Sequence, residues 1–347
     1  MEITERQQNI IIHLILGAND LSGLLGVPEL SLFTARTLQR DLNELISYKY
    51  VDKSGKARAV AYHPTNLGLL GLKFSASSLT KIFENENRNK ISYDFDRLNL
   101  LTSNSLFNDS EQMKLNENNE IYKSKYQSAP TDIIKRERER ITIELSWKSS
   151  QIEGNNYTLL ETESLLKEGV VAPGRTKDET QMILNHKKAL GFAEKNKDMF
   201  DGKISKTLIL ELHKILAENL IESGVRERLV GITGSVYRPL DNKHQLSEEL
   251  ERLCGAINSK SDVFERALIS FVYICYLQPF NDGNKRTARI LANAILNADS
   301  SFPLSLRAVD VNTYKLAILS YYELGALGNA KDVFISQAKY AAENYAI

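Results

Sequence analysis

One segment constrains this chain more than any other: Gln278-Pro279-Phe280-Asn281-Asp282-Gly283-Asn284-Lys285-Arg286-Thr287-Ala288-Arg289. It follows an apolar run, Ala267 to Leu277, which is about half as long as a bilayer crossing and therefore predicts a buried helix. Pro279 and the turn residues after it end that helix, and helix-forming residues resume at Thr287. The sequence thus predicts two helices joined by a short polar loop.

The loop and the second helix carry groups suited to phosphate. The first N–H groups of a helix lack intrahelical partners and, with the helix dipole, attract an anion, to which Gly283 allows close approach. Arg286 and Arg289 are three residues apart, so they share a helix face and offer planar charged donors. Asp282 is a natural Mg²⁺ ligand, and Asn284 can donate to a phosphate oxygen. The alternative is an Asp-Gly surface turn before an ordinary basic helix, but the full set favours a nucleotide site.

The same segment resembles the signature of the Fic family of AMP-transferring proteins, H-P-F-x-(D/E)-G-N-(G/K)-R-x-x-R. The resemblance implies ATP as the nucleotide, Mg²⁺ on Asp282, and transfer of AMP to a Ser, Thr or Tyr hydroxyl of a target protein. It also implies a nucleotide-binding set of Phe280, Asp282, Gly283, Asn284, Lys285, Arg286 and Arg289, with Arg286 stabilising charge during the reaction. Gln278 replaces the family's catalytic histidine, and a carboxamide can orient a hydroxyl but cannot act as a base near neutral pH.

Two of the five histidines of the chain are candidates to replace that base. His244 follows the glycine-rich segment at residues 228–239, and its simpler interpretation is an exposed loop histidine. His213 lies in a predicted helix and is expected to be packed or capping. Neither is predicted to be catalytic.

A second segment, Ser149-Ser150-Gln151-Ile152-Glu153-Gly154, resembles the inhibitory motif of Fic proteins, (S/T)-x-x-x-E-(G/N). The matching positions are Ser149, Glu153 and Gly154. The resemblance implies that Glu153 pairs with Arg289 and occupies the donor that the γ-phosphate of ATP would need. The alternative for Glu153-Gly154 is an ordinary helix C-terminus.

Residues 228–239 form the β element expected in the second half of the chain. Val230, Ile232 and Val236 favour a strand, and Gly231 and Gly234 allow a tight turn, so we expect a hairpin. Together with the preceding Gly224-Val225-Arg226, it is similar to the Fic flap, which covers the nucleotide and pairs with an extended target segment through main-chain bonds. The flap residues are then Gly231, Ile232, Thr233 and Tyr237. A purely structural hairpin is the alternative. The three Fic matches span about residues 145–345.

The sequence of the N-terminal part predicts three short helices followed by a hairpin at Tyr50 to Tyr62. This is the order of elements in a winged helix-turn-helix. Residues 36–45 are also similar to the recognition helices of winged-helix repressors of sugar metabolism. Residues 31–63 hold six basic and three acidic residues, a net of +3, which is a modest footprint for DNA. The candidate DNA contacts are Arg36, Gln39, Arg40, Lys53, Lys56 and Arg58. A protein-interaction module is the alternative.

The expected fold is mainly α: a winged helix-turn-helix at residues 1–63, a helical connecting region at residues 64–130, and a helical Fic domain with its inhibitory helix and a β-hairpin flap at residues 131–347. The 44 basic and 44 acidic residues cancel, so any affinity for nucleic acid must come from a local patch. Two cysteines and an acidic N-terminus without a signal-peptide pattern predict a cytoplasmic protein that does not associate with a membrane. The sequence leaves a homodimer open.

These features give two functional hypotheses. The first is a protein adenylyltransferase, restrained by Glu153 and weakened by Gln278. The second is a non-catalytic nucleotide sensor that controls DNA occupancy through residues 1–63.

Overall fold

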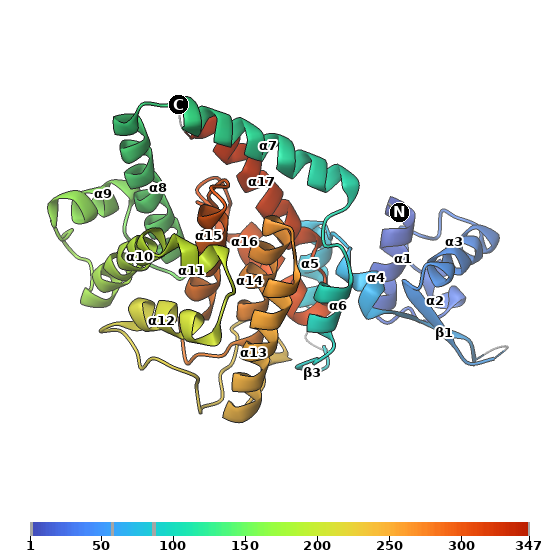
Figure 1. Ribbon diagram of the computed structural model, residues 1–347. Coiled ribbons are helices and arrows are strands. Elements are labelled where there is room, and N and C mark those ends of the chain that lie inside the picture. Colours follow the sequence, from blue (N-terminus) through green and yellow to red (C-terminus); the bar gives the residue numbers. More distant parts are fainter. Residues whose placement is uncertain (1–2, 57–58, 85–87, 346–347) are drawn as a thin grey trace.

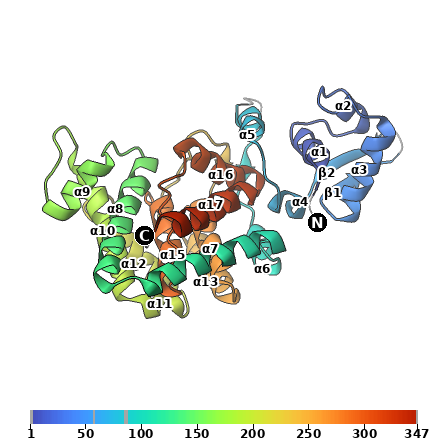
Figure 2. The same cartoon turned by 90° about the horizontal axis from the view of Figure 1, so that it is seen from above.

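The computed structural model describes residues 3–56, 59–84 and 88–345. Within these ranges it has seventeen helices and four short strands, which confirms the predicted mainly α fold. A small N-terminal body lies beside a larger helical body (Figures 1 and 2). Among the described residues, no helix combines the length and the apolar character that a membrane crossing requires.

The N-terminal body contains three helices and an antiparallel strand pair. Thr4 and Thr34 cap the first and third helices with their side-chain oxygens. In the strand pair, Val51 lies opposite Pro64 and Ser54 opposite Ala61. The elements are α1 (Glu5–Ile15), α2 (Leu21–Leu25), α3 (Ala35–Ser47), β1 (Val51–Ser54) and β2 (Ala61–Pro64). This is the predicted order of elements, while the assignment as a winged helix-turn-helix stays a prediction.

Residues 64–130 connect the two bodies: Leu72, Phe74 and Leu79 belong to the hydrophobic core of the N-terminal body, and the region from Tyr93 onward packs into the larger body. Tyr93, Leu98 and Leu115 belong to the same buried cluster as the central helices of that body. The elements of this region are α4 (Asn66–Leu70), α5 (Ala76–Phe83), β3 (Ile91–Ser92), α6 (Arg97–Ser103) and α7 (Asp109–Ser128).

The larger body is built around α14 and α15, which make more contacts with each other than any other pair of elements. Every residue from Ala267 to Leu277 is buried in α14, as the apolar run predicted. The elements of residues 131–345 are α8 (Thr131–Ile152), α9 (Leu159–Glu168), α10 (Lys177–Lys195), α11 (Lys197–Asp201), α12 (Lys206–Ala217), β4 (Tyr237–Arg238), α13 (Lys243–Ser259), α14 (Val263–Leu277), α15 (Asn284–Ala298), α16 (Val311–Leu324) and α17 (Gly328–Asn344).

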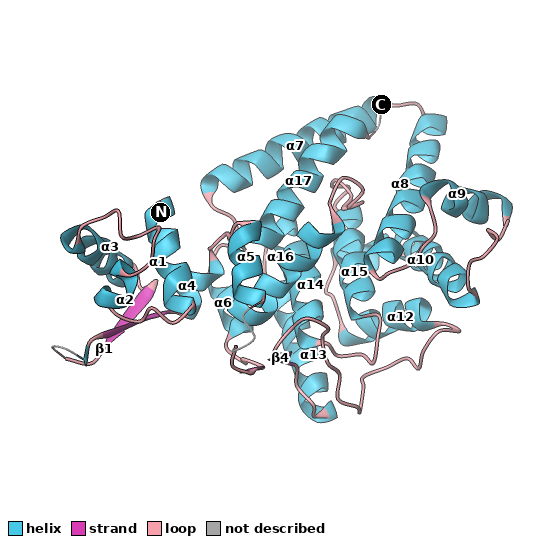
Figure 3. Cartoon of the chain, turned by 180° about the vertical axis from the view of Figure 1, so that it is seen from behind, coloured by secondary structure: helices cyan, strands magenta, loops and turns pink. Residues whose placement is uncertain are grey.

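The predicted hairpin at residues 228–239 is corrected by the structure. All of these residues are described, and no strand pair forms among them. The segment bends through a turn in which Ser235 N donates to Ile232 O at 3.1 Å, and then runs into β4, which is labelled in Figure 3. Tyr237 and Arg238 of β4 pair in parallel with the distant strand β3, a partner that local sequence does not reveal. We call residues 228–240 the flap segment.

The two bodies meet at the loop between α16 and α17. Gly328 N donates to Leu72 O at 3.0 Å, and a Cβ at residue 328 would lie 2.3 Å from that oxygen, so only glycine fits. The Asn329 side chain makes two bonds to the backbone of Phe74, at 3.0 and 2.8 Å. Leu324 at the end of α16 is part of the hydrophobic core of the N-terminal body. One helix, α16, therefore reaches both bodies.

Candidate nucleotide-binding site

The loop between α14 and α15 is shaped by two left-handed residues. Gln278 ends α14 with φ 50° and ψ 55°, and Gly283 caps α15 with φ 80°. Helix α15 begins at Asn284, three residues earlier than the sequence predicted. Its first backbone bond runs from Thr287 N to Gly283 O, at 2.8 Å. The N–H groups before Thr287 therefore face the loop without intrahelical acceptors, as an anion site requires.

Asn284 holds this loop together. Its Oδ1 accepts from Phe280 N at 2.9 Å, and its Nδ2 donates to Phe280 O at 2.9 Å and to Gln278 Oε1 at 3.0 Å. Both amide hydrogens are thus used inside the loop. The predicted bond from Asn284 to a phosphate is not available in this arrangement, because the side chain that could make it holds the loop in shape.

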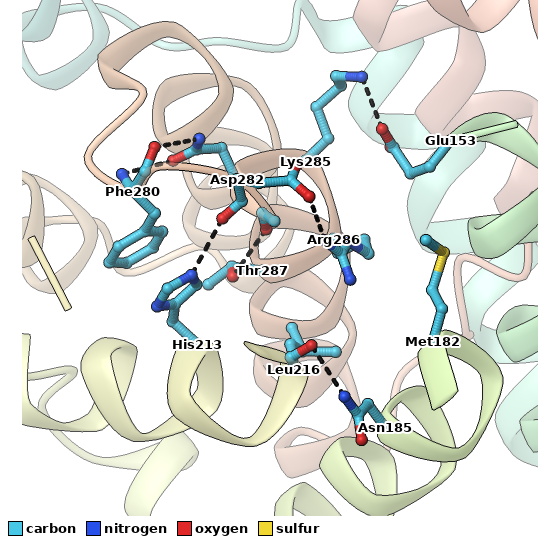
Figure 4. A network of polar contacts seen from close by, with 12 residues as sticks. Glu153, Met182, Asn185, His213, Leu216, Phe280, Asp282, Lys285, Arg286 and Thr287 are labelled. Carbon is cyan, nitrogen blue, oxygen red and sulfur yellow. Dashed lines mark hydrogen bonds and ion pairs between the residues drawn. The ribbon is translucent and has the colours of Figure 1, made fainter. Parts of the chain in front are cut away.

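Arg286 has an unsatisfied donor next to this loop. Its NH2 donates to Asp282 Oδ2 at 2.8 Å (Figure 4), but its NH1 is buried without a partner, and the side chain is only 2% exposed. A buried guanidinium nitrogen without an acceptor is costly unless a ligand supplies one. An anion at the start of α15 would supply it.

Glu153 is held by two cations. Its Oε1 accepts from Arg289 NH2 at 2.8 Å, so the predicted ion pair is present, and its Oε2 accepts from Lys285 Nζ at 2.7 Å (Figure 4). Burial alone would raise the pKa of Glu153, but Arg289 and Lys285 lower it to about 2. Glu153 is also the C-cap of α8 and directly precedes Gly154 at φ 93°, so the alternative interpretation as a helix C-terminus is correct as well.

Arg289 is fully buried and bonded on all sides. Its Nε donates to Ser149 Oγ at 2.8 Å, its NH2 to Ser149 O at 3.0 Å, and its NH1 to Tyr314 OH at 3.1 Å. Ser149 also bonds with His186 Nε2 at 2.7 Å, and burial lowers the pKa of His186 to about 3. The predicted residues Ser149 and Arg289 are therefore brought together with His186, which no sequence motif indicated.

Gln278 is occupied by structural hydrogen bonds. Its Nε2 donates to Cys275 O at 2.6 Å and to Tyr322 OH at 3.4 Å, and its Oε1 accepts from Asn284. The side chain has no base next to it, because burial raises the pKa of the Cys275 thiol to about 12 and that of Tyr322 well above its ordinary value.

Neither candidate histidine supplies a base. His213 stacks on Phe280 with ring centroids 3.7 Å apart, and its Nε2 bonds with Asp282 O at 3.0 Å. Burial lowers its pKa to about 4, so it is a neutral packed residue, as predicted. His244 is exposed near the start of α13, in agreement with its simpler interpretation.

A pocket of about 430 Å³ lies beside the loop. Among the predicted residues it is lined by Gln278, Asp282, Asn284, Lys285, Glu153, Gly154, Gly231, Ile232 and Thr233. One wall comes from α16, through Tyr314, Lys315, Ile318, Leu319 and Tyr322, which the sequence did not single out as site residues.

Other predicted residues lie behind this surface. Tyr237 is buried and donates its hydroxyl hydrogen to Tyr276 O at 2.9 Å, so it anchors the flap segment and does not line the pocket. Phe280 is also fully buried, against His213.

The candidate Mg²⁺ ligand is placed suitably. The side chain of Asp282 is 63% exposed at the pocket, next to the unsatisfied nitrogen of Arg286. One carboxylate with phosphate oxygens and water is a common way to hold Mg²⁺. Within the described ranges, no group of three His, Cys, Asp or Glu side chains could hold a metal ion without such a substrate.

The candidate DNA-contacting residues lie on α3 and near β1. Arg36 and Arg40 are exposed on α3, and Lys53 and Lys56 are exposed at the hairpin. Gln39 Nε2 donates to Tyr62 OH at 3.2 Å, so this side chain ties α3 to β2. Arg58 lies outside the described residues. DNA binding stays a prediction.

Comparisons with known proteins agree with this geometry. Residues 203–296 match the model of the Fic/DOC family. The chain is 32% identical over 187 residues to "Protein adenylyltransferase fic-1" of Caenorhabditis elegans, covering 51% of this chain and 35% of that protein. It is 31% identical over 185 residues to "Protein adenylyltransferase Fic" of Nematostella vectensis, covering 48% and 40%. The chain thus matches little more than a third of the length of these relatives.

Solved structures show the same fold. Fic-1 of Caenorhabditis elegans superposes with a TM-score of 0.56 at 21% identity, covering 100% of this chain and 93% of that one. A Fic domain-containing signaling protein of Bacteroides thetaiotaomicron VPI-5482 superposes with a TM-score of 0.54 at 19% identity, covering 66% and 95%. The chain therefore has the Fic fold, and its residues 203–296 match a Fic/DOC family domain.

Proposed function

We propose that this chain binds ATP in the pocket beside α15 and transfers AMP slowly to a hydroxyl group of a target protein. The observation that carries the proposal is the buried, unsatisfied NH1 of Arg286 in the first turn of α15, whose NH2 bonds to Asp282 at the pocket. Two relatives named protein adenylyltransferase support the reaction class.

In this reaction the target hydroxyl oxygen bonds to the α-phosphorus, and the bond from that phosphorus to the pyrophosphate oxygen breaks. Arg286 and the N–H groups at the start of α15 would neutralise charge that develops on the phosphates. Mg²⁺, held by Asp282 and phosphate oxygens, would supply further charge neutralisation. The backbone of Val230 and Gly231, at the pocket wall, would align an extended target segment.

The hydroxyl proton has no base to receive it at residue 278. Without general-base help the rate falls by about 10²- to 10⁴-fold, while positioning and charge stabilisation remain. We therefore expect weak transfer.

Glu153 restrains the site in this proposal. A γ-phosphate that approaches Arg289 must displace a carboxylate already held by two cations. Removal of the carboxylate should free Arg289 for ATP.

The test is labelling with α-labelled ATP and a protein acceptor mixture. Glu153→Gly should label weakly, and Glu153→Gly/Gln278→His should label about 10²- to 10⁴-fold faster, since a base is restored. Arg286→Gln added to the double variant is the control and should abolish labelling. Absence of labelling by the double variant, with ATP binding intact, would contradict AMP transfer.

A second candidate is a nucleotide sensor without transfer that controls DNA binding by the N-terminal body. It is favoured by α16, whose Tyr314 and Tyr322 line the pocket while Leu324 lies in the core of the N-terminal body. At the end of the same helix, Glu323 Oε1 accepts from Ser235 Oγ at 2.7 Å in the flap segment, and its other oxygen pairs with Arg88. A movement of the flap segment would therefore shift Glu323 and the end of α16, and would change the contacts at the junction of the two bodies.

The test of this second function starts from a random-sequence DNA pool, from which the sequences that bind the wild-type protein are selected. Fluorescence anisotropy at low salt should show binding that weakens in Arg36→Ala/Arg40→Ala and changes when Mg·ATP is added. Binding that is identical with and without nucleotide would eliminate the sensor.

A further inference from the structure

Arg226 occupies an unusual position between α12 and β4. Its side chain is 1% exposed, and its guanidinium reaches three carbonyl groups from separate places. Nε donates to Gln278 O at 2.7 Å, NH1 donates to Arg228 O at 2.7 Å, and NH2 donates to Leu240 O. The first carbonyl belongs to Gln278, the first residue of the segment 278–289 that we call the anion loop. The other two carbonyls lie at the two ends of the flap segment.

This cation is satisfied by dipoles alone. Within the described residues no carboxylate hydrogen-bonds to Arg226; burial lowers its pKa, and Tyr237 and Asp241 offset this only in part. An arginine stays charged in a protein, and burying a charge without a paired carboxylate is expensive. A neutral side chain at this position would avoid that cost, so stability alone does not account for an arginine here. The three hydrogen bonds that its guanidinium makes to separate carbonyl groups do account for it.

The backbone next to Arg226 is also hydrogen-bonded to the loop between α14 and α15. Arg226 N donates to Pro279 O at 3.0 Å, and two residues earlier Gly224 N donates to His213 Nδ1 at 3.4 Å. Nε2 of the same imidazole bonds with Asp282 O, so His213 is a second link between this segment and the loop. Residue 278 itself is left-handed without being glycine, a conformation that needs support from its surroundings.

We propose that Arg226 is a positioning residue that fixes both ends of the flap segment to the carbonyl of residue 278, so that flap and anion loop keep one relative geometry around the nucleotide. The proposal rests on the assignment of the pocket as a nucleotide site. It adds that residues 230–233 form a stable pocket wall only while the guanidinium holds residues 228 and 240 in place.

Two consequences follow for a transfer-competent parent, Glu153→Gly/Gln278→His. Loosening the flap segment weakens nucleotide binding and raises KM for ATP, because the pocket wall is lost. Loosening the carbonyl of residue 278 lowers kcat, because the restored histidine is no longer oriented. A residue that acted only on global stability would change neither constant at a temperature where the protein is folded.

The experiment compares Arg226→Gln and Arg226→Lys in that parent. Lysine keeps the charge but cannot reach three carbonyls at once. The control is Lys243→Gln, which removes an exposed positive charge three residues after Leu240. We expect both Arg226 variants to bind Mg·ATP about tenfold more weakly by calorimetry, the loss of roughly one charge-assisted hydrogen bond. We also expect a lower kcat and faster hydrogen exchange at residues 229–236, with the control unchanged.

The outcomes are distinguishable. Full retention of ATP affinity, kcat and flap protection in Arg226→Lys, with losses in Arg226→Gln, would show that charge alone matters and would overturn the positioning role. Unchanged values in both variants would overturn it too. If the parent binds no ATP, the proposed function fails, while hydrogen exchange of the free protein still tests whether Arg226 holds the flap segment. If Arg226→Gln does not fold, Arg226→Lys and Arg226→Met provide the same comparison.

Discussion

The anion loop at residues 278–289 and the flap segment at residues 228–240 face the same pocket but are held in different ways. The loop is fixed mainly by bonds between residues four to six apart, such as those of Asn284 and the pair Arg286–Asp282. The flap segment is fixed by distant partners: Ile91, Glu323 and Tyr276. The loop therefore takes most of its form from its own sequence, with Arg226 and His213 as distant supports, whereas the flap segment takes its form from the rest of the fold.

This difference explains which predictions succeeded. The loop and the helix after it were predicted correctly because their groups lie within one short stretch of sequence, and the anion site there stays a prediction. The hairpin was predicted from strand-forming residues of the flap segment, but in the structure only Tyr237 and Arg238 pair, with a strand more than a hundred residues earlier. Local preference gave the right extended backbone at Tyr237 and Arg238 but not its partner.

The strongest test of the local loop is Asn284→Ala. The change removes three bonds at once and leaves Phe280 N and O unsatisfied in a buried site. We expect the free energy of unfolding to fall by about 3 kcal/mol and Mg·ATP binding to be lost. Urea titration and calorimetry measure both. A loss below about 1 kcal/mol would mean that distant contacts also hold the loop.

The second test concerns a charged distant contact of the loop helix, the pairing of Glu153 with Lys285 and Arg289. The pKa of Glu153 is about 2 in the folded chain, below its ordinary value. The stabilisation that this pairing gives to the folded state is therefore complete above the pKa of the unfolded chain and is lost as pH falls toward 2. Between neutral pH and about pH 3 the wild type should lose about 2 kcal/mol more unfolding free energy than Glu153→Gln. Equal losses in denaturant titrations of both proteins would contradict this.

The smallest expected effect is on the flap segment. Glu323→Gln keeps the shape of the side chain but removes the charge that holds Ser235 Oγ, Val236 N and Arg88. We expect about 1 kcal/mol of lost stability and faster hydrogen exchange confined to residues 235–238. Protection at Val236 equal to that of the wild type would show that β3 alone holds the segment. Acceleration across the anion loop as well would break the contrast between the two regions.

The candidate site was predictable to the extent that its residues lie in motifs. Glu153 and Arg289 are 136 residues apart and were paired in advance only because both motifs resemble known Fic segments. Tyr322 and His186 carry no motif, so their roles appear only where their side chains meet the loop. The sequence position of Asn284 suggested a donor to phosphate, which stays a prediction, and did not reveal the bonds that its side chain makes within the loop.

The sequence by itself determined the buried helix at residues 267–277, the anion loop and helix after it, and the loss of a base at residue 278, because each depends on the chemistry of adjacent residues. The tertiary structure decided the partner of the flap segment, the wall that α16 gives to the pocket, and the occupation of Gln278 by Cys275, Tyr322 and Asn284. These depend on which distant groups packing brings within hydrogen-bond distance. That choice is made by the whole buried core, and no short stretch of sequence records it.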